Sequence, residues 1–365
     1  MRRFFALLMA VSPWVLCQQP ATVVLSNDRI ELTIASRGGA MTSLVLKDDP
    51  ARLSPFGDPA RMGRNVLGHF VCVDGFGGVS KEEQAAGLPG HGEAHAQPWE
   101  VASFRKDGKV NTVRFSVKLP IVQEVFTRTL SVVDGEDVVY VDSELESALG
   151  FDRPVNWGEH PSIAAPFLEP EKVVVDVSGR RSKTRAYDTA AARSRTLASF
   201  RDFEWPMAPL IAGGTRDLRS APANPASLDH VTTLVDPARA YGYVTALHTG
   251  SHYLLGYLFR RDEFPWVQDW QSYPKDLRMY RGIEFATQPF DVPRRETVQL
   301  NSMFEAPTYR WLPARSRIGS RFLMFWTRTP AGMTRVDDVR LEGGQLVIED
   351  RAAGKRITLA ASLGL

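Results

Sequence analysis

The sequence predicts an all-β protein, built as one large antiparallel β-sandwich. Three observations carry this prediction. Apolar and polar residues alternate in short runs, as in residues 30–34, which is typical of half-buried strands. Turn-forming dipeptides such as Asp107-Gly108 and Asp134-Gly135 separate successive runs. No long apolar helix pattern competes with these signals.

The expected strands follow one another along most of the chain. They lie within residues 22–34, where two runs flank a turn, and within 41–46, 101–117, 121–131, 137–145, 231–235, 240–247, 253–259, 339–341, 345–348 and 356–360. The stretch 180–201, rich in Ala, Arg and Ser, is expected to form a helix or a mobile loop, and 218–224 a loop. Neither a tandem repeat nor a Pro/Ser-rich linker divides the chain, so we expect a single domain over residues 18–365.

Residues 1–17 are expected to be a signal peptide, because the basic pair Arg2 and Arg3 precedes a short apolar run. The run is too short to span a bilayer comfortably. Cleavage before Gln18 would give a periplasmic or secreted protein. A lipid on Cys17 is the alternative, which the preceding Leu16 fits poorly. In both cases we expect contact with a membrane only through this N-terminal segment.

Charge and cysteine content exclude several classes of partner and site. The formal net charge of +2 falls to zero once Arg2 and Arg3 are removed. A neutral chain lacks the basic face that a nucleic-acid partner needs. Cys17 and Cys72 are the only cysteines, so cleavage would leave neither an intrachain disulfide nor a zinc–thiolate site. Cys72 lies in an apolar run and is expected to be buried.

Two histidines occur in a loop-like stretch, residues 88–100. Pro89 and Gly90 predict a turn directly before His91. His91 and His95 are four residues apart, a spacing that suits metal ligands on a helix. Because proline and glycine argue against a helix here, we expect no metal site. The simplest interpretation of this stretch alone is a polar surface loop.

Three further stretches carry side chains suited to acid–base chemistry. His160 directly follows Glu159 and precedes a proline, and Asp229-His230 stands ahead of a strand. Glu284 lies between two apolar residues, which could raise its pKa. Each residue also has an ordinary interpretation. His160 could cap a turn, Asp229 could start an Asx turn, and Glu284 could face water.

Taken in order, these stretches resemble the motifs of the aldose 1-epimerases, in the galactose mutarotase-like superfamily. Residues 88–100 resemble the family's His-Gly-x-x-Arg loop and the Pro-Trp that follows it, with His95 at the arginine position. Residues 154–163 resemble the segment that carries the family's second histidine, and residues 228–230 resemble the segment with its sugar-binding aspartate. Residues 282–289 resemble the strand with its catalytic glutamate, and residues 38–40 resemble its early glycine turn. The resemblance covers residues 21 to about 304. The family's Asn-Arg element is not evident, although Arg64-Asn65 has the reverse order.

The resemblance implies a galactose mutarotase-like supersandwich that interconverts the α and β anomers of a sugar by acid–base ring opening, without a metal or cofactor. Glu284 would act as base and His160 as acid, and His91 would stabilise developing charge. The expected sugar contacts are Asp229 and His95 for hydroxyl groups, and Trp157 or Trp270 for an apolar face, with Trp266 as a third candidate. The ligand would be a monosaccharide or an oligosaccharide.

Two other functions remain open at this point. The first is a non-catalytic carbohydrate-binding protein on the same fold. The second is a glycosidase or lyase, which would need a second carboxylate about 5–10 Å from Glu284. Glu159 and Asp269 are the candidates for that carboxylate. The sequence specifies neither the sugar nor the oligomeric state.

Overall fold

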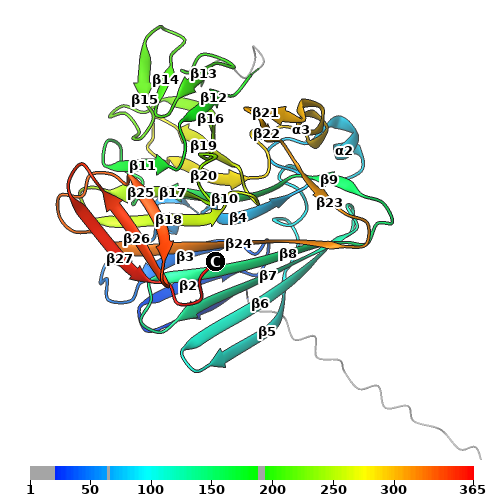
Figure 1. The fold of residues 1–365 in the computed structure, drawn as a ribbon, viewed down its shortest axis with the longest axis horizontal. Coiled ribbons are helices and arrows are strands. Elements are labelled where there is room, and N and C mark those ends of the chain that lie inside the picture. Colours follow the sequence, from blue (N-terminus) through cyan, green and yellow to red (C-terminus); the bar gives the residue numbers. More distant parts are fainter. Residues whose placement is uncertain (1–20, 64–65, 188–193) are drawn as a thin grey trace, which may run out of the picture.

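Two large antiparallel sheets pack face to face and form the predicted β-sandwich (Figure 1). The computed structural model describes residues 21–63, 66–187 and 194–365. The predicted signal peptide lies outside the described residues. In the described part of the chain, no helix is long and apolar enough to cross a membrane.

The first sheet has ten strands and the second has eight. In spatial order, the ten-stranded sheet contains β1 (Thr22–Ser26), β2 (Ile30–Ala35), β3 (Met41–Leu46), β4 (Gly68–Val73), β10 (Trp157–Ala164), β20 (Tyr280–Ala286), β19 (Trp266–Tyr273), β16 (Ser227–Leu234), β12 (Arg181–Thr184) and β13 (Asp202–Glu204). The eight-stranded sheet contains β11 (Val173–Val177), β17 (Tyr241–His248), β18 (Tyr253–Arg260), β24 (Arg317–Arg328), β8 (Val138–Ser147), β7 (Glu124–Val133), β6 (Val110–Leu119) and β5 (Glu100–Asp107).

Smaller elements connect and cover these sheets. They are the pairs β14 (Met207–Pro209) with β15 (Thr215–Asp217), β21 (Ser302–Met303) with β22 (Ala306–Pro307) and β9 (Arg153–Val155) with β23 (Arg310–Leu312), a three-stranded sheet of β25 (Asp338–Glu342), β26 (Gln345–Asp350) and β27 (Lys355–Ala360), and the short helices α1 (Pro59–Met62), α2 (Lys81–Ala85) and α3 (Arg294–Leu300).

The predicted strands are confirmed, with boundaries that shift by a few residues at most ends. The loop expected at 218–224 is also confirmed, and Cys72 is buried as expected. The stretch 180–201 differs, because its described part contains strand β12 and no α-helix. β12 pairs with β16, placing Ser182 opposite Thr233. Residues 188–193 of this stretch lie outside the described residues.

A charged cluster lies between the two large sheets. Glu159 of β10 is fully buried and accepts a hydrogen bond from Arg128 of β7 across the interior. His69 Nε2 of β4 lies 2.9 Å from Glu159 Oε2, and Trp157 Nε1 donates to Oε1 at 3.1 Å. Burial alone would raise the pKa of Glu159, but Arg128 and then His69 overcome it and hold that pKa below its usual value. These contacts hold the Glu159 side chain of β10 in the interior, between the two sheets.

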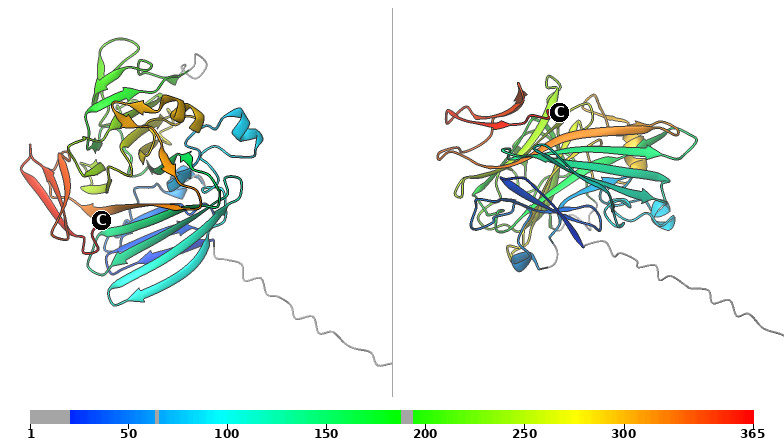
Figure 2. Two further views of the ribbon diagram at one scale, coloured as in Figure 1. Left: turned by 45° about the vertical axis from the view of Figure 1, so that its right-hand side comes forward. Right: turned by 90° about the horizontal axis from the view of Figure 1, so that it is seen from below.

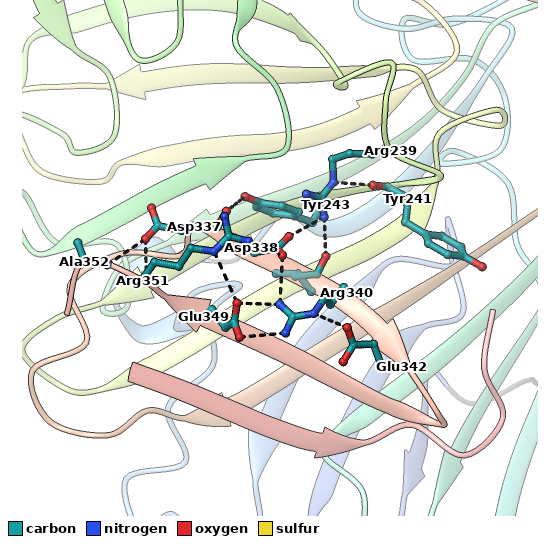
Figure 3. Close-up of polar contacts among 11 residues, drawn as sticks. Arg239, Tyr241, Tyr243, Asp337, Asp338, Arg340, Glu342, Glu349, Arg351 and Ala352 are labelled. Carbon is teal, nitrogen blue, oxygen red and sulfur yellow. Dashed lines mark hydrogen bonds and ion pairs between the residues drawn. The ribbon is translucent and has the colours of Figure 1, made fainter. Parts of the chain in front are cut away.

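The C-terminal sheet β25–β27 forms a small separate layer outside the eight-stranded sheet (Figure 2). Its apolar side chains, such as Ile348, join a second core with Leu258 of β18 and Phe325 of β24. Ion pairs border this core (Figure 3). Arg340 donates two hydrogen bonds to Glu349, at 2.7 and 2.9 Å. The outer face of the eight-stranded sheet is therefore covered in part by the end of the chain.

Candidate active site

A cavity of about 490 Å³ opens on the face of the ten-stranded sheet that is turned away from the sandwich interior. Its floor is formed by side chains from β4, β10, β20, β19 and β16. These five strands are neighbours in the ten-stranded sheet (Figure 1). The lining residues are Ala40, Val66, Leu67, Phe70, Phe76, Gly77, His91, His95, His160, His230, Trp270, Glu284 and Asp291. The cavity therefore combines an apolar wall with four imidazoles and two carboxylates.

Strand register explains why distant histidines meet here. In an antiparallel pair, residues that face each other point to the same side of the sheet. His160 of β10 lies opposite Phe70 of β4, and their rings stack with centroids 4.4 Å apart. His230 of β16 lies opposite Trp270 of β19. Because side chains alternate along a strand, His160 faces the cavity while its neighbour Glu159 faces the sandwich interior.

His160 and Glu284 form one imidazole–carboxyl pair in the cavity. Nε2 of His160 lies 3.1 Å from Oε1 of Glu284, although that oxygen has no aligned hydrogen bond among the described residues. On the other side of the ring, Nδ1 lies 3.0 Å from the hydroxyl oxygen of Ser162. The imidazole is thus held between a hydroxyl and a carboxyl group.

Gly282 makes room for the Glu284 carboxyl group. It lies two residues earlier on β20, on the same face, opposite Ser162 on one side and Trp270 on the other. A Cβ atom at position 282 would lie 2.1 Å from Glu284 Oε1. The carboxyl group can therefore lie flat against the strand, within reach of His160, only because residue 282 has no side chain.

The environment shifts the pKa values of these two groups in opposite directions. Burial raises the pKa of Glu284 well above its usual range, and the nearby charges of Asp291 and Asp269 add to this effect. Burial lowers the pKa of His160 well below its usual range, and His91 adds to it. The two groups are close enough to titrate as a unit. The directions of both shifts favour a proton on the carboxyl group over one on the imidazole.

His91 enters the cavity from the loop before β5, in a left-handed backbone conformation with φ of 63°. The N–H of Gly77 donates to its Nδ1 at 3.2 Å, so the neutral ring carries its proton on Nε2. Burial, with His95 adding, lowers the pKa of His91 to about 4, so the ring is neutral at neutral pH. Gly92 is required beside it, because a Cβ atom there would lie 1.8 Å from the carbonyl oxygen of Val73. His91 can therefore donate a hydrogen bond without carrying a charge.

Known proteins share this architecture. No family model matches the chain, and no curated protein has a significant sequence similarity to it. Among solved structures, the galactose mutarotase related enzyme of Lactobacillus acidophilus matches with a TM-score of 0.56 at 12% identity, covering 88% of this chain and 100% of the other. A galactose mutarotase-like protein of Clostridium acetobutylicum matches with 0.57 at 14% identity, covering 84% and 95%. One of Lactobacillus casei matches with 0.56 at 14% identity, covering 84% and 100%.

The chain has a galactose mutarotase-like fold. The resemblance seen in the sequence is therefore confirmed at the level of the fold. Identity this low leaves the chemistry to be argued from the residues of the cavity.

Within this galactose mutarotase-like fold, five of the seven predicted site residues line the cavity: His91, His95, His160, Trp270 and Glu284. The other two, Asp229 and Trp157, do not. Asp229 is buried outside the cavity and accepts hydrogen bonds from the backbone N–H groups of Thr196 and Leu197, at 2.9 and 3.1 Å. Trp157 is fully buried beside Glu159. Neither side chain lies in the cavity with the other five.

The candidates for a glycosidase's second carboxylate also lie elsewhere. Glu159 belongs to the interior cluster, and Asp269 is paired with Arg281, whose Nε lies 2.8 Å from Asp269 Oδ1. Trp266, the third aromatic candidate, is buried and donates from Nε1 to the carbonyl oxygen of Pro307. The second carboxylate of the cavity is instead Asp291.

Sequence reasoning missed His230 and Asp291 as site residues. Asp229 and His230 are adjacent on β16, so only one of them can face the cavity. The motif resemblance favoured Asp229, whereas in the structure it is His230 that faces the cavity. A signal was present in the strand pattern, since a residue that faces the cavity must alternate with residues that face the interior.

Proposed function

We propose that this protein is a sugar mutarotase, which interconverts α and β anomers at the His160–Glu284 pair. The observation that carries the proposal is the contact between these two groups in a 490 Å³ cavity of a galactose mutarotase-like fold. A carboxyl group and an imidazole with one proton between them provide both an acid and a base. Anomer interconversion requires that combination.

Ring opening requires two proton transfers, one to O5 and one from the C1 hydroxyl group. The C1–O5 bond breaks while Glu284 gives its proton to O5 and Nε2 of His160 takes the proton of the C1 hydroxyl. The products are an open-chain aldehyde and a carboxylate–imidazolium pair. Rotation about C1–C2 exposes the other face of the carbonyl group, and closure returns both protons. The roles expected from the sequence, with Glu284 as base and His160 as acid, correspond to a start with the proton on His160. The directions of the pKa shifts favour the start from Glu284 instead.

The neighbouring side chains support this role. Neutral His91 can donate from Nε2 to an oxygen on which negative charge develops. Trp270 and Phe70 offer apolar surface for the C–H face of a sugar ring. His95 lines the same cavity, at the position where the resembled family has an arginine.

Polarimetry tests the proposal directly. The optical rotation of freshly dissolved α-glucose or α-galactose should relax faster with the protein than in buffer, in proportion to protein concentration. Binding of these sugars without faster relaxation would replace the mutarotase with a non-catalytic carbohydrate-binding protein. Release of reducing ends from oligosaccharides would indicate a glycosidase.

Gly282→Ala should slow anomer interconversion by about 10- to 100-fold, because the added methyl group displaces the Glu284 carboxyl group. Thermal melting should show whether the variant stays folded. Gly319→Ala on β24 is the matched control, since a Cβ atom there has its nearest neighbour, the carbonyl oxygen of Ser143, at 3.5 Å. Equal rates for both variants would contradict the role given to Gly282.

A further inference from the structure

His230 and Asp291 form a second imidazole–carboxylate contact in the cavity, which the proton transfers described above do not use. Nδ1 of His230 lies 2.8 Å from Oδ1 of Asp291. Neither ring nitrogen of His230 has an aligned hydrogen bond among the described residues, and both nitrogens are buried. Nε2 is therefore a buried polar atom in a cavity wall with no partner there. Such an atom lowers stability unless a ligand or a water molecule satisfies it.

Asp291 is held in place by groups behind it. Arg185 donates from Nε to Oδ1 and from Nη2 to the backbone carbonyl oxygen of Asp291, the latter at 2.9 Å. Gly77 lies against the same residue, and a Cβ atom there would be 2.7 Å from Cβ of Asp291. Burial alone would raise the pKa of Asp291, but His230 and Arg185 lower it to about 2, so the carboxylate is charged at neutral pH.

A charged carboxylate beside Nδ1 selects one form of the neutral imidazole. In that form the proton is on Nδ1, which lies 2.8 Å from Oδ1 of Asp291, and the lone pair of Nε2 is free to accept. His91 has the opposite arrangement, because its Nδ1 accepts from Gly77. The cavity therefore offers a donor at His91 and a potential acceptor at His230, in addition to the His160–Glu284 pair.

We propose that Nε2 of His230 accepts a hydrogen bond from one hydroxyl group of the bound sugar and selects for sugars that carry that hydroxyl, while Asp291 and Arg185 act as positioning residues. This inference rests on the proposed function only in taking the ligand to be a sugar, and it does not require turnover. A site built to bind a hydroxyl group rejects an analogue that lacks it, because the polar group of the site is then left unpaired. His230 would thus perform the task that the sequence assigned to Asp229.

The test combines one substitution with single deletions on the ligand. His230→Phe keeps a ring of similar shape and removes both nitrogens. Dissociation constants would be measured by calorimetry for glucose, galactose and their 2-, 3-, 4- and 6-deoxy analogues. In the wild type, removal of one particular hydroxyl should weaken binding by about 10- to 100-fold. In His230→Phe, the parent sugar should bind about that much more weakly, and removal of the same hydroxyl should cause no further loss.

Two further variants complete the design. Asp291→Asn should reduce discrimination at the same hydroxyl by a smaller factor, and it supplies the result if His230→Phe does not fold. His248→Phe is the matched control, since His248 also lies near a carboxylate, 3.3 Å from Glu169, but does not line the cavity. It should discriminate among the analogues as the wild type does.

The outcomes separate this inference from the mutarotase proposal. Unchanged discrimination in His230→Phe and in Asp291→Asn would overturn the role of His230, even if the wild type interconverts anomers. Lost discrimination with no interconversion in the wild type would overturn the mutarotase proposal and support His230 as the hydroxyl acceptor. A wild type that binds none of these sugars would overturn the inference.

Discussion

Glu284→Gln should lower the rate of anomer interconversion by about 10²- to 10⁴-fold, the range typical of general acid–base groups. Glutamine has nearly the same size as glutamate and can still form hydrogen bonds, but it neither gives nor takes the proton that the His160–Glu284 pair exchanges. Sugar affinity should change much less, because His91 and His230 remain. Polarimetry and a sugar titration on the two proteins measure both effects.

The same substitution should not lower the stability of the protein at neutral pH. Burial raises the pKa of Glu284 in the folded state. The wild type therefore loses stability as pH rises from the ordinary value, about 4.3, toward the folded pKa, because ionisation favours the unfolded chain. Glutamine does not titrate, so the stability of the variant relative to wild type should increase over that range. Thermal melts at pH 5 and pH 8 would show the trend.

Glu263→Gln is a suitable control for both measurements. Burial also raises the pKa of Glu263, but this residue does not line the cavity and accepts instead from the backbone N–H of Arg321 at 2.8 Å. It should leave interconversion unchanged. Wild-type turnover in Glu284→Gln would remove Glu284 from the mechanism. A large loss of stability at every pH would instead indicate a structural role.

Arg128→Met should lower the free energy of unfolding by about 3–5 kcal/mol, the usual cost of leaving a buried charge without its partner. Arg128 is 1% exposed, and its Nη2 donates to Glu159. The substitution keeps much of the aliphatic length but leaves the buried carboxylate with only His69 and Trp157. Urea or thermal unfolding would measure the loss.

The double variant Arg128→Met with Glu159→Leu tests whether the loss arises from the unpaired charge. Replacing a whole buried ion pair by apolar residues is often neutral or stabilising. The double variant should therefore be more stable than Arg128→Met alone. A single variant as stable as the wild type, or a double variant less stable than the single one, would contradict this account of the cluster.

The sequence was sufficient for the class of fold because alternation is a local property. Runs such as 30–34 and the Asp107-Gly108 turn predict strands and hairpins without knowledge of the rest of the chain. The order of strands in the sheets is not local. β10 lies between β4 and β20, which are far from it in sequence, and no short pattern predicts that pairing. The stretch 180–201 shows the same limit, since β12 depends on its partner β16.

For the candidate site, the motif resemblance located strands that line the cavity, but it did not always locate the residues on those strands that face it. His160 and Glu284 line the cavity as expected. Asp229 was chosen over His230 because the motif favours the aspartate, although adjacent residues on a strand face opposite ways. The facing direction follows from register, which places His230 opposite Trp270. Alternation along the strand shows that only one of these two residues can face the cavity, but which one does so depends on how β16 is paired, and that is a tertiary property.

The two faces of strand β10 lie in different environments, and neither environment suits the side chain of the other face. Glu159 needs the dry interior with Arg128, whereas His160 needs the open cavity with Glu284. A slip of one position in the pairing of β10 would exchange these two side chains, leaving a bare carboxylate in the cavity and an imidazole against a guanidinium in the interior. Misaligned chains would thus lose the His160–Glu284 pair of the cavity and the Arg128–Glu159 ion pair of the interior together. The correct register of β10 with its neighbouring strands is therefore needed both for a stable interior and for an intact cavity.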